Sequence, residues 1–333
     1  MIVTRRRAVL ALKTLLAGVV VGGVAWHLGK LLADNPVPSG TLSPNYGCLA
    51  AAGLLYLGCH TIWGTFFYQL LRKQGSTVGW VPVIRAYFLS QAGKYVPGKA
   101  WVLLLRVVIL RRTGLTTTAI AVAGIYETLT SMAAGAIIGA LLLPWSGLVF
   151  ADGSLQRYAI FGIAALPVGA ILLNRLAMRV ARRFRGPNQA LIPKPPFWLL
   201  VRGLLQASVG WLMLGASLHL TVIGLSDAEL PLTADSAAGL VVANAIAYIS
   251  GFVAIILPGG LGVREELLQR MLSVQLRPTM GDSATGFAVV TAFALRLVWT
   301  LFEIAFSLLL WWLGRVRSPA VAEPRLVEAT HVL

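Results

Sequence analysis

The sequence predicts an all-α, polytopic membrane helix bundle with about 7–8 membrane segments plus broken or re-entrant helical hairpins. Hydrophobic residues make up 57% of the 333 residues and charged residues only 12%, whereas a soluble domain carries about 25% charged residues. Several apolar runs reach the roughly 20 residues that a helix needs to cross a bilayer. Basic connections between these runs alternate with acidic or neutral ones.

The apolar runs expected to form membrane segments are 8–33, 47–71, 115–143, 158–173, 198–223, 236–257 and 284–313. The first run follows Arg5, Arg6 and Arg7, so it is either a signal peptide or a retained helix. Its length and the lack of a small-residue cleavage site favour the retained helix. The arginines also faintly resemble a twin-arginine export signal, but such residues are common before a first membrane helix.

Basic residues exceed acidic residues by 28 to 12, which gives a net charge of +16. In a soluble protein this balance would indicate a nucleic-acid partner. Here the basic residues lie mostly in short loops, as the positive-inside rule requires of cytoplasmic connections. We therefore expect a multi-pass protein of the plasma (cytoplasmic or inner) membrane with a cytoplasmic N-terminus, contacts with anionic lipids and no nucleic-acid partner. Tryptophans near run ends are assigned to an interfacial belt: Trp63, Trp80, Trp145, Trp198, Trp311 and Trp312.

Residues 81–110 are too few for two full spans, yet basic residues flank them on both sides. Pro97 and Gly98 divide this stretch, and proline interrupts the hydrogen-bond ladder of a helix. We therefore predict a re-entrant hairpin of two short helices that enters from the cytoplasm. Non-helical backbone at membrane depth is tolerated where protein buries it or where it lines a wet cavity, so this break indicates a site.

A second break occurs in the sequence Pro-Gly-Gly-Leu-Gly of residues 258–262. The helix that resumes there would direct its positive end, with Arg264, toward the break. If residues 236–278 return to the side from which they enter, the last run ends in the cytoplasm, and we prefer this arrangement. One broken hairpin from each side of the membrane is the pattern of an inverted repeat with a central binding site.

Lys94, Lys99 and Glu127 are charged residues at membrane depth. The two lysines either extend to the cytoplasmic surface or hold a phosphate or other anionic headgroup. Glu127 either forms a buried ion pair, with Lys94 or Arg296 as the candidate partner, or binds a substrate amine or a proton.

Arg264, Glu265, Arg296 and Glu303 are the corresponding charges of the second half. Arg296 and Glu303 are about two helical turns apart, too far for direct contact, so each needs another partner. The candidate partner of Arg296 is Glu265, and the candidates for Glu303 are Arg264 and Lys94.

The sequence contains no recognisable catalytic constellation, nucleotide loop or metal-ligand spacing. We therefore expect a protein that is not an enzyme, with no catalytic residue, metal or cofactor. Residues 1–317 are assigned to one integral membrane domain and residues 318–333 to a short disordered tail.

Two motifs together resemble the signatures of the lysylphosphatidylglycerol synthase transmembrane-region family, which includes the flippase domain of the multiple peptide resistance factor. The motifs are Leu-Ser-Gln-Ala-Gly-Lys-Tyr-Val-Pro-Gly-Lys at 89–99 and Leu-Pro-Gly-Gly-Leu-Gly-Val-Arg-Glu at 257–265. The resemblance implies a flippase-like membrane domain whose motif residues are Lys94, Tyr95, Pro97, Gly98 and Lys99, then Pro258, Gly259, Gly260, Gly262, Arg264 and Glu265. Glu127 and Arg296 are added as substrate-binding candidates from their charge and position.

The resemblance implies a lipid translocator that moves an anionic or aminoacylated phospholipid, or a lipid-linked glycan, between leaflets. Family members that make lysyl-lipid carry a further aminoacyl-transferring domain, which is not expected here because the chain stops after Leu333. The alternative is a non-transporting membrane subunit that presents a lipid-linked substrate to a separate glycosyltransferase or synthase. A solute or ion symporter is a weaker third alternative.

Overall fold

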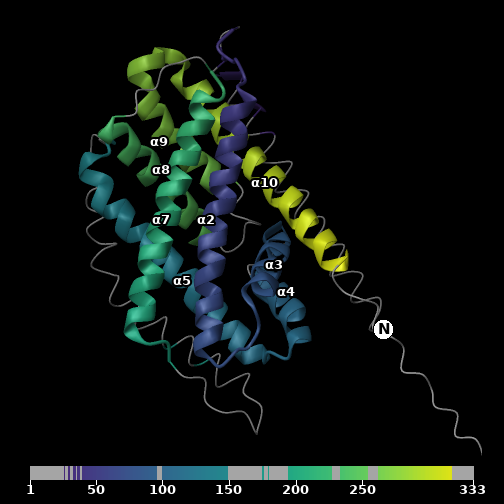
Figure 1. Cartoon of the computed structure of the whole chain (residues 1–333). Helices are drawn as coiled ribbons and strands as arrows, with labels where there is room; N and C mark the ends of the chain where they lie inside the picture. Colours follow the sequence, from purple (N-terminus) through teal and green to yellow (C-terminus); the bar gives the residue numbers. More distant parts are fainter. Residues whose placement is uncertain are drawn as a thin grey trace, which may run out of the picture.

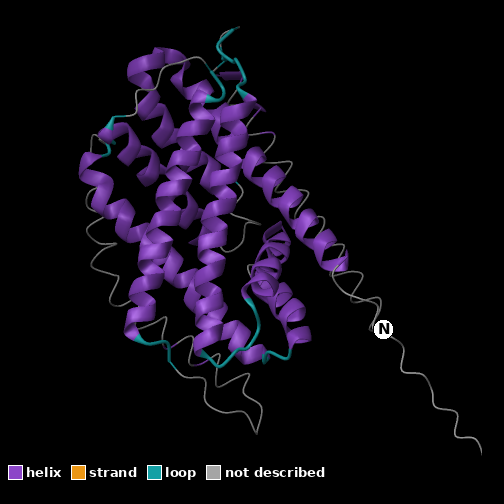
Figure 2. Ribbon diagram, viewed as in Figure 1, coloured by secondary structure: helices purple, strands orange, loops and turns teal. Residues whose placement is uncertain are grey.

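The structure is a computed structural model that describes residues 40–95, 100–148, 194–226, 233–253 and 262–316 and a few isolated positions outside these ranges. The described residues form helices and contain no strand (Figures 1 and 2). The α-helices are α2 (Tyr46–Lys73), α3 (Trp80–Ser90), α4 (Ala100–Leu110), α5 (Thr117–Leu142), α7 (Phe197–Ile223), α8 (Ala234–Val253), α9 (Val263–Met280) and α10 (Ala284–Val316). Short 3-10 helices extend or join them: η1 (Gln91–Tyr95), η2 (Arg111–Thr113), η3 (Leu143–Trp145) and η5 (Gly281–Ser283).

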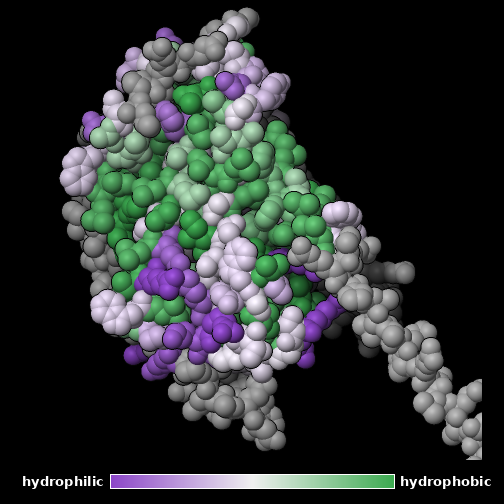
Figure 3. Space-filling view, in the orientation of Figure 1, coloured by the Kyte–Doolittle hydropathy of each residue, from purple (hydrophilic) through white to green (hydrophobic). Residues whose placement is uncertain are grey.

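Five helical stretches of the described residues are long and apolar enough to cross a membrane: 46–73, 117–145, 197–223, 234–252 and 263–314. A broad apolar band covers much of the face in Figure 3, and hydrophilic residues gather toward its lower end. These features confirm the predicted all-helical, multi-pass membrane protein. The predicted runs 8–33 and 158–173 and the predicted tail 318–333 lie outside the described residues, except for single positions in the first run.

The bundle has two ends, which we name after Asn45 and Arg72. At the Asn45 end, the segment before α2 forms backbone hydrogen bonds with the segment after α7. Asn45 N–H donates to the carbonyl oxygen of Gly224 at 2.9 Å. The Asn45 side chain caps α2 by accepting from the N–H groups of Gly47 and Cys48. At the Arg72 end, the last turn of α2 carries Arg72 and Lys73, which favour the negative end of the helix dipole.

Helices α2 and α7 pack side by side through the centre of the bundle (Figure 1). Glycines on α7 make this approach possible, because a Cβ at Gly203 would lie 2.2 Å from the ring of Phe66. A Cβ at Gly210 would lie 2.3 Å from the indole nitrogen of Trp63. Large rings of one helix therefore occupy the space left by missing side chains on the other, the dense packing expected of membrane helices.

The first hairpin consists of α3, η1 and α4. Its two arms are antiparallel, since Arg106 Nε donates to Ser90 Oγ at 3.3 Å and Gly93 lies against the backbone of Trp101 nearer the tip. Both arms connect to the Arg72 end, where α2 ends and α5 begins. This confirms the prediction of two short helices in residues 81–110. The predicted break at Pro97 and Gly98 lies outside the described residues.

The second hairpin consists of α8 and α9, which pack against each other. Gln275 near the end of α9 lies against Gly239 near the start of α8, and its side-chain amide donates to the carbonyl oxygen of Ser146 at 3.2 Å. Arg264 at the start of α9 lies against Tyr248 near the end of α8. This hairpin therefore enters and leaves at the Asn45 end, opposite to the first.

Helix α10 returns the chain to the Arg72 end. The chain reverses direction at Gly281, whose φ of +56° favours glycine. Helix α10 then packs along α9 and ends beside α3, where Arg85 Nη2 donates to the carbonyl oxygen of Trp311 at 3.4 Å. This agrees with the preferred arrangement, in which residues 236–278 return to the side from which they enter.

Candidate functional site

Two interruptions of helices are predicted, at Pro97-Gly98 and at residues 258–262. The described residues nearest to them contact one stretch of α10, Arg296–Glu303. From the first hairpin, Lys94 pairs with Glu303, and the Tyr95 hydroxyl donates to Thr300 Oγ1 at 3.2 Å. From the second hairpin, Glu265 pairs with Arg296, and Arg264 lies over the ring of Trp299. Residues of two hairpins from opposite ends of the bundle therefore contact neighbouring turns of the same helix.

Glu303 is the centre of the contacts that the first hairpin makes with α10. Its side chain is only 3% exposed, and it accepts hydrogen bonds from Lys94 Nζ and from the Tyr56 hydroxyl of α2. Lys94 Nζ also lies 3.1 Å from the Tyr56 hydroxyl and keeps 29% of its side chain exposed. The structure thus selects Lys94 from the two predicted partners of Glu303.

Arg264 lies between two aromatic rings. Its guanidinium carbon is 4.6 Å from the ring centre of Tyr248 on α8 and 4.6 Å from that of Trp299 on α10. Such cation–π contacts each contribute about 0.5–2 kcal/mol. Among the described residues, no carboxylate oxygen lies within 4.0 Å of its nitrogens.

Glu265, the residue after Arg264, closes the first turn of α9. It pairs with Arg296 as predicted, and its other oxygen accepts the N–H of Gly262 at 2.7 Å. Gly262 has a φ of +89°, which favours glycine at this position. The N–H groups at the start of a helix have no acceptor within the helix. A glutamate side chain that accepts the N–H of the residue before its helix satisfies one of these donors. Glu265 thereby links Gly262, the residue before α9, to Arg296 of α10.

Glu127 pairs with Arg106 of α4, at 3.1 Å, and not with Lys94 or Arg296 as predicted. Glu127 Oε1 accepts from the Tyr87 hydroxyl at 3.0 Å, and Oε2 accepts from Arg106 and from Thr128. Both charged side chains are less than 5% exposed. The guanidinium of Arg106 also lies over the rings of Tyr87 and Phe67, at 4.3 and 4.7 Å.

Arg106 is the charged residue that the sequence analysis missed. It is the one charged residue of Ala-Trp-Val-Leu-Leu-Leu-Arg-Val-Val-Ile-Leu, the sequence of α4. An arginine in the middle of such an apolar run needs a buried partner, because an unpaired charge there is costly. That signal indicates that Arg106 needs a buried partner, and the structure identifies this partner as Glu127 of the next helix.

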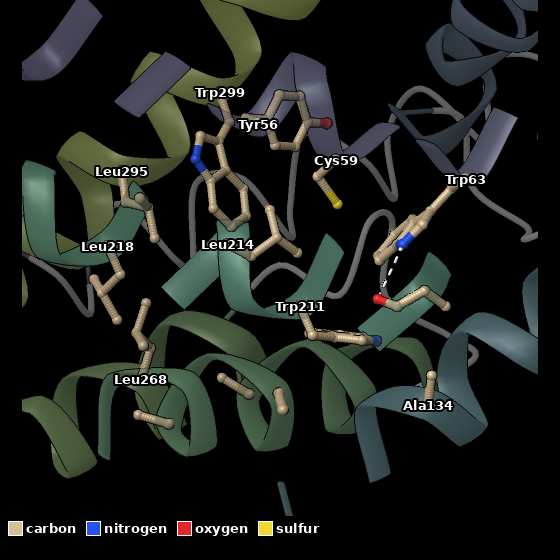
Figure 4. Close-up of a cluster of buried hydrophobic side chains, with 14 of the residues drawn as sticks. Tyr56, Cys59, Trp63, Ala134, Trp211, Leu214, Leu218, Leu268, Leu295 and Trp299 are labelled. Carbon is tan, nitrogen blue, oxygen red and sulfur yellow. Dashed lines mark hydrogen bonds between the residues drawn. The ribbon is translucent and has the colours of Figure 1, made fainter. Parts of the chain in front are cut away.

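Aromatic side chains pack between the charged groups in the core, and Figure 4 shows four of them: Tyr56, Trp63, Trp211 and Trp299. Trp299 stacks on Tyr56 with ring centres 4.8 Å apart, and Tyr56 lies 4.2 Å from His60. Trp63 lies 5.3 Å from His60, and Trp211 lies 5.4 Å from Tyr248 in an edge arrangement. Rings thus connect the carboxylate of Glu303 to the guanidinium of Arg264 with close packing.

Trp63 belongs to this core and not to the interfacial belt to which its sequence position assigned it. Its side chain is buried, and its indole N–H donates to the carbonyl oxygen of Ala207 at 3.4 Å. The other tryptophans predicted in the belt are exposed: Trp80, Trp145, Trp198, Trp311 and Trp312. Trp63 differs from them because Gly210 of α7 leaves space for its ring.

Several predicted site residues lie outside the described residues: Pro97, Gly98, Lys99, Pro258, Gly259 and Gly260. The structure brings together Lys94, Tyr95, Arg264, Glu265 and Arg296 along α10, whereas Glu127 lies in a separate cluster with Arg106. Among the described residues, no three His, Cys, Asp or Glu side chains are grouped to hold a metal ion.

No protein-family model matches the sequence, and no curated protein matches it. The resemblance to the lysylphosphatidylglycerol synthase transmembrane-region family therefore stays a prediction that depends on the two motifs.

Proposed function

We propose that this protein moves a lipid with an anionic headgroup between the leaflets of its membrane and that Arg264 binds the headgroup. The observation that carries the proposal is a guanidinium that lies between two rings at the start of α9, beside α10, and has no carboxylate partner among the described residues. A cation inside a membrane domain is costly and is normally paired, hydrated or functional. A phosphate of a lipid headgroup would supply the missing partner, and arginine binds phosphate through paired hydrogen bonds.

The arrangement of the two hairpins supports transport rather than static binding. Each hairpin enters from a different end of the bundle, and together they would form the inverted repeat predicted from the paired breaks. In such architectures the substrate lies near the membrane centre, and rocking of one repeat against the other exposes it to either side. Lys94 and Arg296 are already paired with carboxylates, so we assign them to positioning the hairpins around Arg264.

The charge distribution supports placing the Arg72 end in the cytoplasm of a plasma-membrane protein. Arg72, Lys73, Arg111 and Arg112 all lie near this end, in or beside short connections. The positive-inside rule retains such residues on the cytoplasmic side. With a first membrane helix in residues 8–33, the N-terminus would also be cytoplasmic.

Reconstitution tests the proposal directly. Purified protein in phosphatidylcholine vesicles should speed the exchange of tail-labelled phosphatidylglycerol between leaflets, measured by chemical quenching of the label in the outer leaflet. The Arg264→Gln variant should reduce this rate at least about tenfold, because it removes the cation that binds the headgroup. Arg270→Gln is the matched control, since Arg270 lies on the same helix, 69% exposed and paired with Glu266.

Equal exchange by wild-type protein, by Arg264→Gln and by empty vesicles would contradict the proposal. Retention of a lipid by the wild-type protein without any exchange would instead favour the non-transporting subunit that presents a lipid to a separate enzyme. Mass spectrometry of the lipids that remain on the purified protein distinguishes these two results.

A further inference from the structure

Every carboxylate inside the described bundle already has a cation. Asp34, Asp235 and Asp282 are exposed, and the last two lie at the Asn45 end. The remaining carboxylates of the described helices form ion pairs, namely Glu127 with Arg106, Glu265 with Arg296, Glu266 with Arg270 and Glu303 with Lys94. Among the described residues where the two hairpins contact α10, Arg264 is thus the cation without a carboxylate partner.

The sequence of the two breaks adds no negative charge near Arg264. Residues 96–99 are Val-Pro-Gly-Lys, and residues 254–261 are Ala-Ile-Ile-Leu-Pro-Gly-Gly-Leu. Neither segment contains Asp or Glu, and the first contributes one more lysine. The described residues around Arg264 therefore include no unpaired carboxylate, and the two break segments contain none by composition.

This charge balance bears on which headgroup can bind. A phosphodiester brings a negative charge that can pair with the guanidinium of Arg264. An aminoacyl headgroup brings one or more ammonium groups as well, and each would need a carboxylate or would face like charge at low dielectric. Glu303 is the nearest candidate, one helical turn from Trp299, but Lys94 and the Tyr56 hydroxyl already occupy it.

We infer that the site is specific for an anionic phosphodiester headgroup without an amine and discriminates against aminoacylated lipids. The inference rests on the proposed function, since it specifies the substrate class of the same site. Phosphatidylglycerol and lysylphosphatidylglycerol form a matched pair of probes, because they share the phosphodiester and differ by the lysyl group. Their comparison therefore isolates the effect of the amines.

Leaflet exchange of the two tail-labelled lipids in separate phosphatidylcholine vesicles tests the inference. We expect phosphatidylglycerol to exchange at least about tenfold faster, which corresponds to about 1.4 kcal/mol of discrimination. Equal or faster exchange of lysylphosphatidylglycerol would overturn the inference and leave the proposed function intact. Inorganic phosphate in excess should not slow the exchange of phosphatidylglycerol, and strong competition would reassign the site to a soluble anion.

If neither lipid exchanges, the proposed function is wrong, and the lipids retained on the purified protein decide the inference. Enrichment of phosphatidylglycerol over lysylphosphatidylglycerol that Arg264→Gln loses would support it. Equal retention of both lipids would overturn it. Failure of transport and failure of specificity are thereby measured separately.

A charge variant provides a stronger test, since it should change the preference rather than abolish activity. Lys94→Met leaves Glu303 without its cation, so its carboxylate can accept an ammonium or pair with Arg264. Either event should lower the ratio of phosphatidylglycerol to lysylphosphatidylglycerol exchange at least about fivefold. The double variant Lys94→Met with Glu303→Gln removes both charges and should restore the wild-type ratio. An unchanged ratio in a folded Lys94→Met protein would overturn the inference.

Discussion

In the first hairpin, Lys94 and Arg106 each reach a carboxylate on a neighbouring helix, whereas in the second hairpin Arg264 reaches only aromatic rings. Both hairpins have a Pro-Gly break in their sequence and a cation close to it. Their cations nevertheless have different environments. In the first hairpin, charge fixes α4 and η1 to α5 and α10, whereas Arg264 is free of any carboxylate among the described residues.

In the second hairpin, the order of residues in the first turn of α9 explains why Arg264 contacts rings and Glu265 forms the ion pair. Adjacent residues of a helix project about 100° apart, so the side chains of Arg264 and Glu265 leave α9 in different directions. Glu265 points to Arg296, and Arg264 points to the rings of Tyr248 and Trp299. A glycine-rich break therefore marks where a site can form, and the neighbours of each charge decide whether that charge is structural or available to a ligand.

Removal of Arg106 should have the largest effect on stability. Arg106→Met leaves Glu127 buried without its cation, and loss of one partner of a buried ion pair costs about 3–5 kcal/mol. We expect a marked drop in the melting temperature of the detergent-solubilised protein, measured by intrinsic fluorescence or calorimetry. The double variant Arg106→Met with Glu127→Gln removes both charges and should recover most of this loss. If the single variant melts like the wild type, the pair does not hold the first hairpin in place.

The sequence could predict many of the helices and two of the ion pairs, because the lengths of the apolar runs and the spacing of the charged residues determine them. Runs of about 20 apolar residues predict the spans. The shortness of residues 81–110 predicts the two short helices of the first hairpin. The spacing of Arg296 and Glu303 indicates that each needs another partner, and the pairs with Glu265 and Lys94 are present.

The partner of Glu127 and the location of Trp63 could not be predicted in the same way. Both depend on the rotation of one helix about its axis relative to another, which an all-round apolar sequence does not encode. Arg106 faces α5 because α4 returns along α3, and Trp63 fills a space created by a glycine on α7. Such contacts join residues far apart in the chain, so no local pattern reports them.

Gly93→Ala should have an intermediate effect that is also confined to the first hairpin. A Cβ at Gly93 would lie 2.6 Å from the carbonyl carbon of Trp101 and from the amide nitrogen of Val102, both of which are backbone atoms. The arms must separate to admit the methyl group, and overpacking of this kind costs about 1–3 kcal/mol. The melting temperature should fall less than for Arg106→Met. Gly79→Ala is the control, since its Cβ would meet only Pro82 Cδ at 3.8 Å. Equal melting temperatures for the two variants would show that the arms are not closely packed.

Arg264→Gln should change stability least, although we expect it to reduce lipid exchange most. The substitution breaks no ion pair among the described residues and removes contacts with two rings, which together contribute about 1–2 kcal/mol in a partly exposed setting. The cost of desolvating a cation disappears at the same time, which offsets part of this loss. The melting temperature should therefore stay close to that of the wild type and of Arg270→Gln. A phosphatidylglycerol headgroup bound to Arg264 should raise the melting temperature of the wild type, because a ligand that binds only the folded state stabilises it. The same lipid should leave Arg264→Gln unchanged. A large loss of stability in Arg264→Gln without added lipid would mean that this arginine holds the second hairpin together, as Arg106 holds the first.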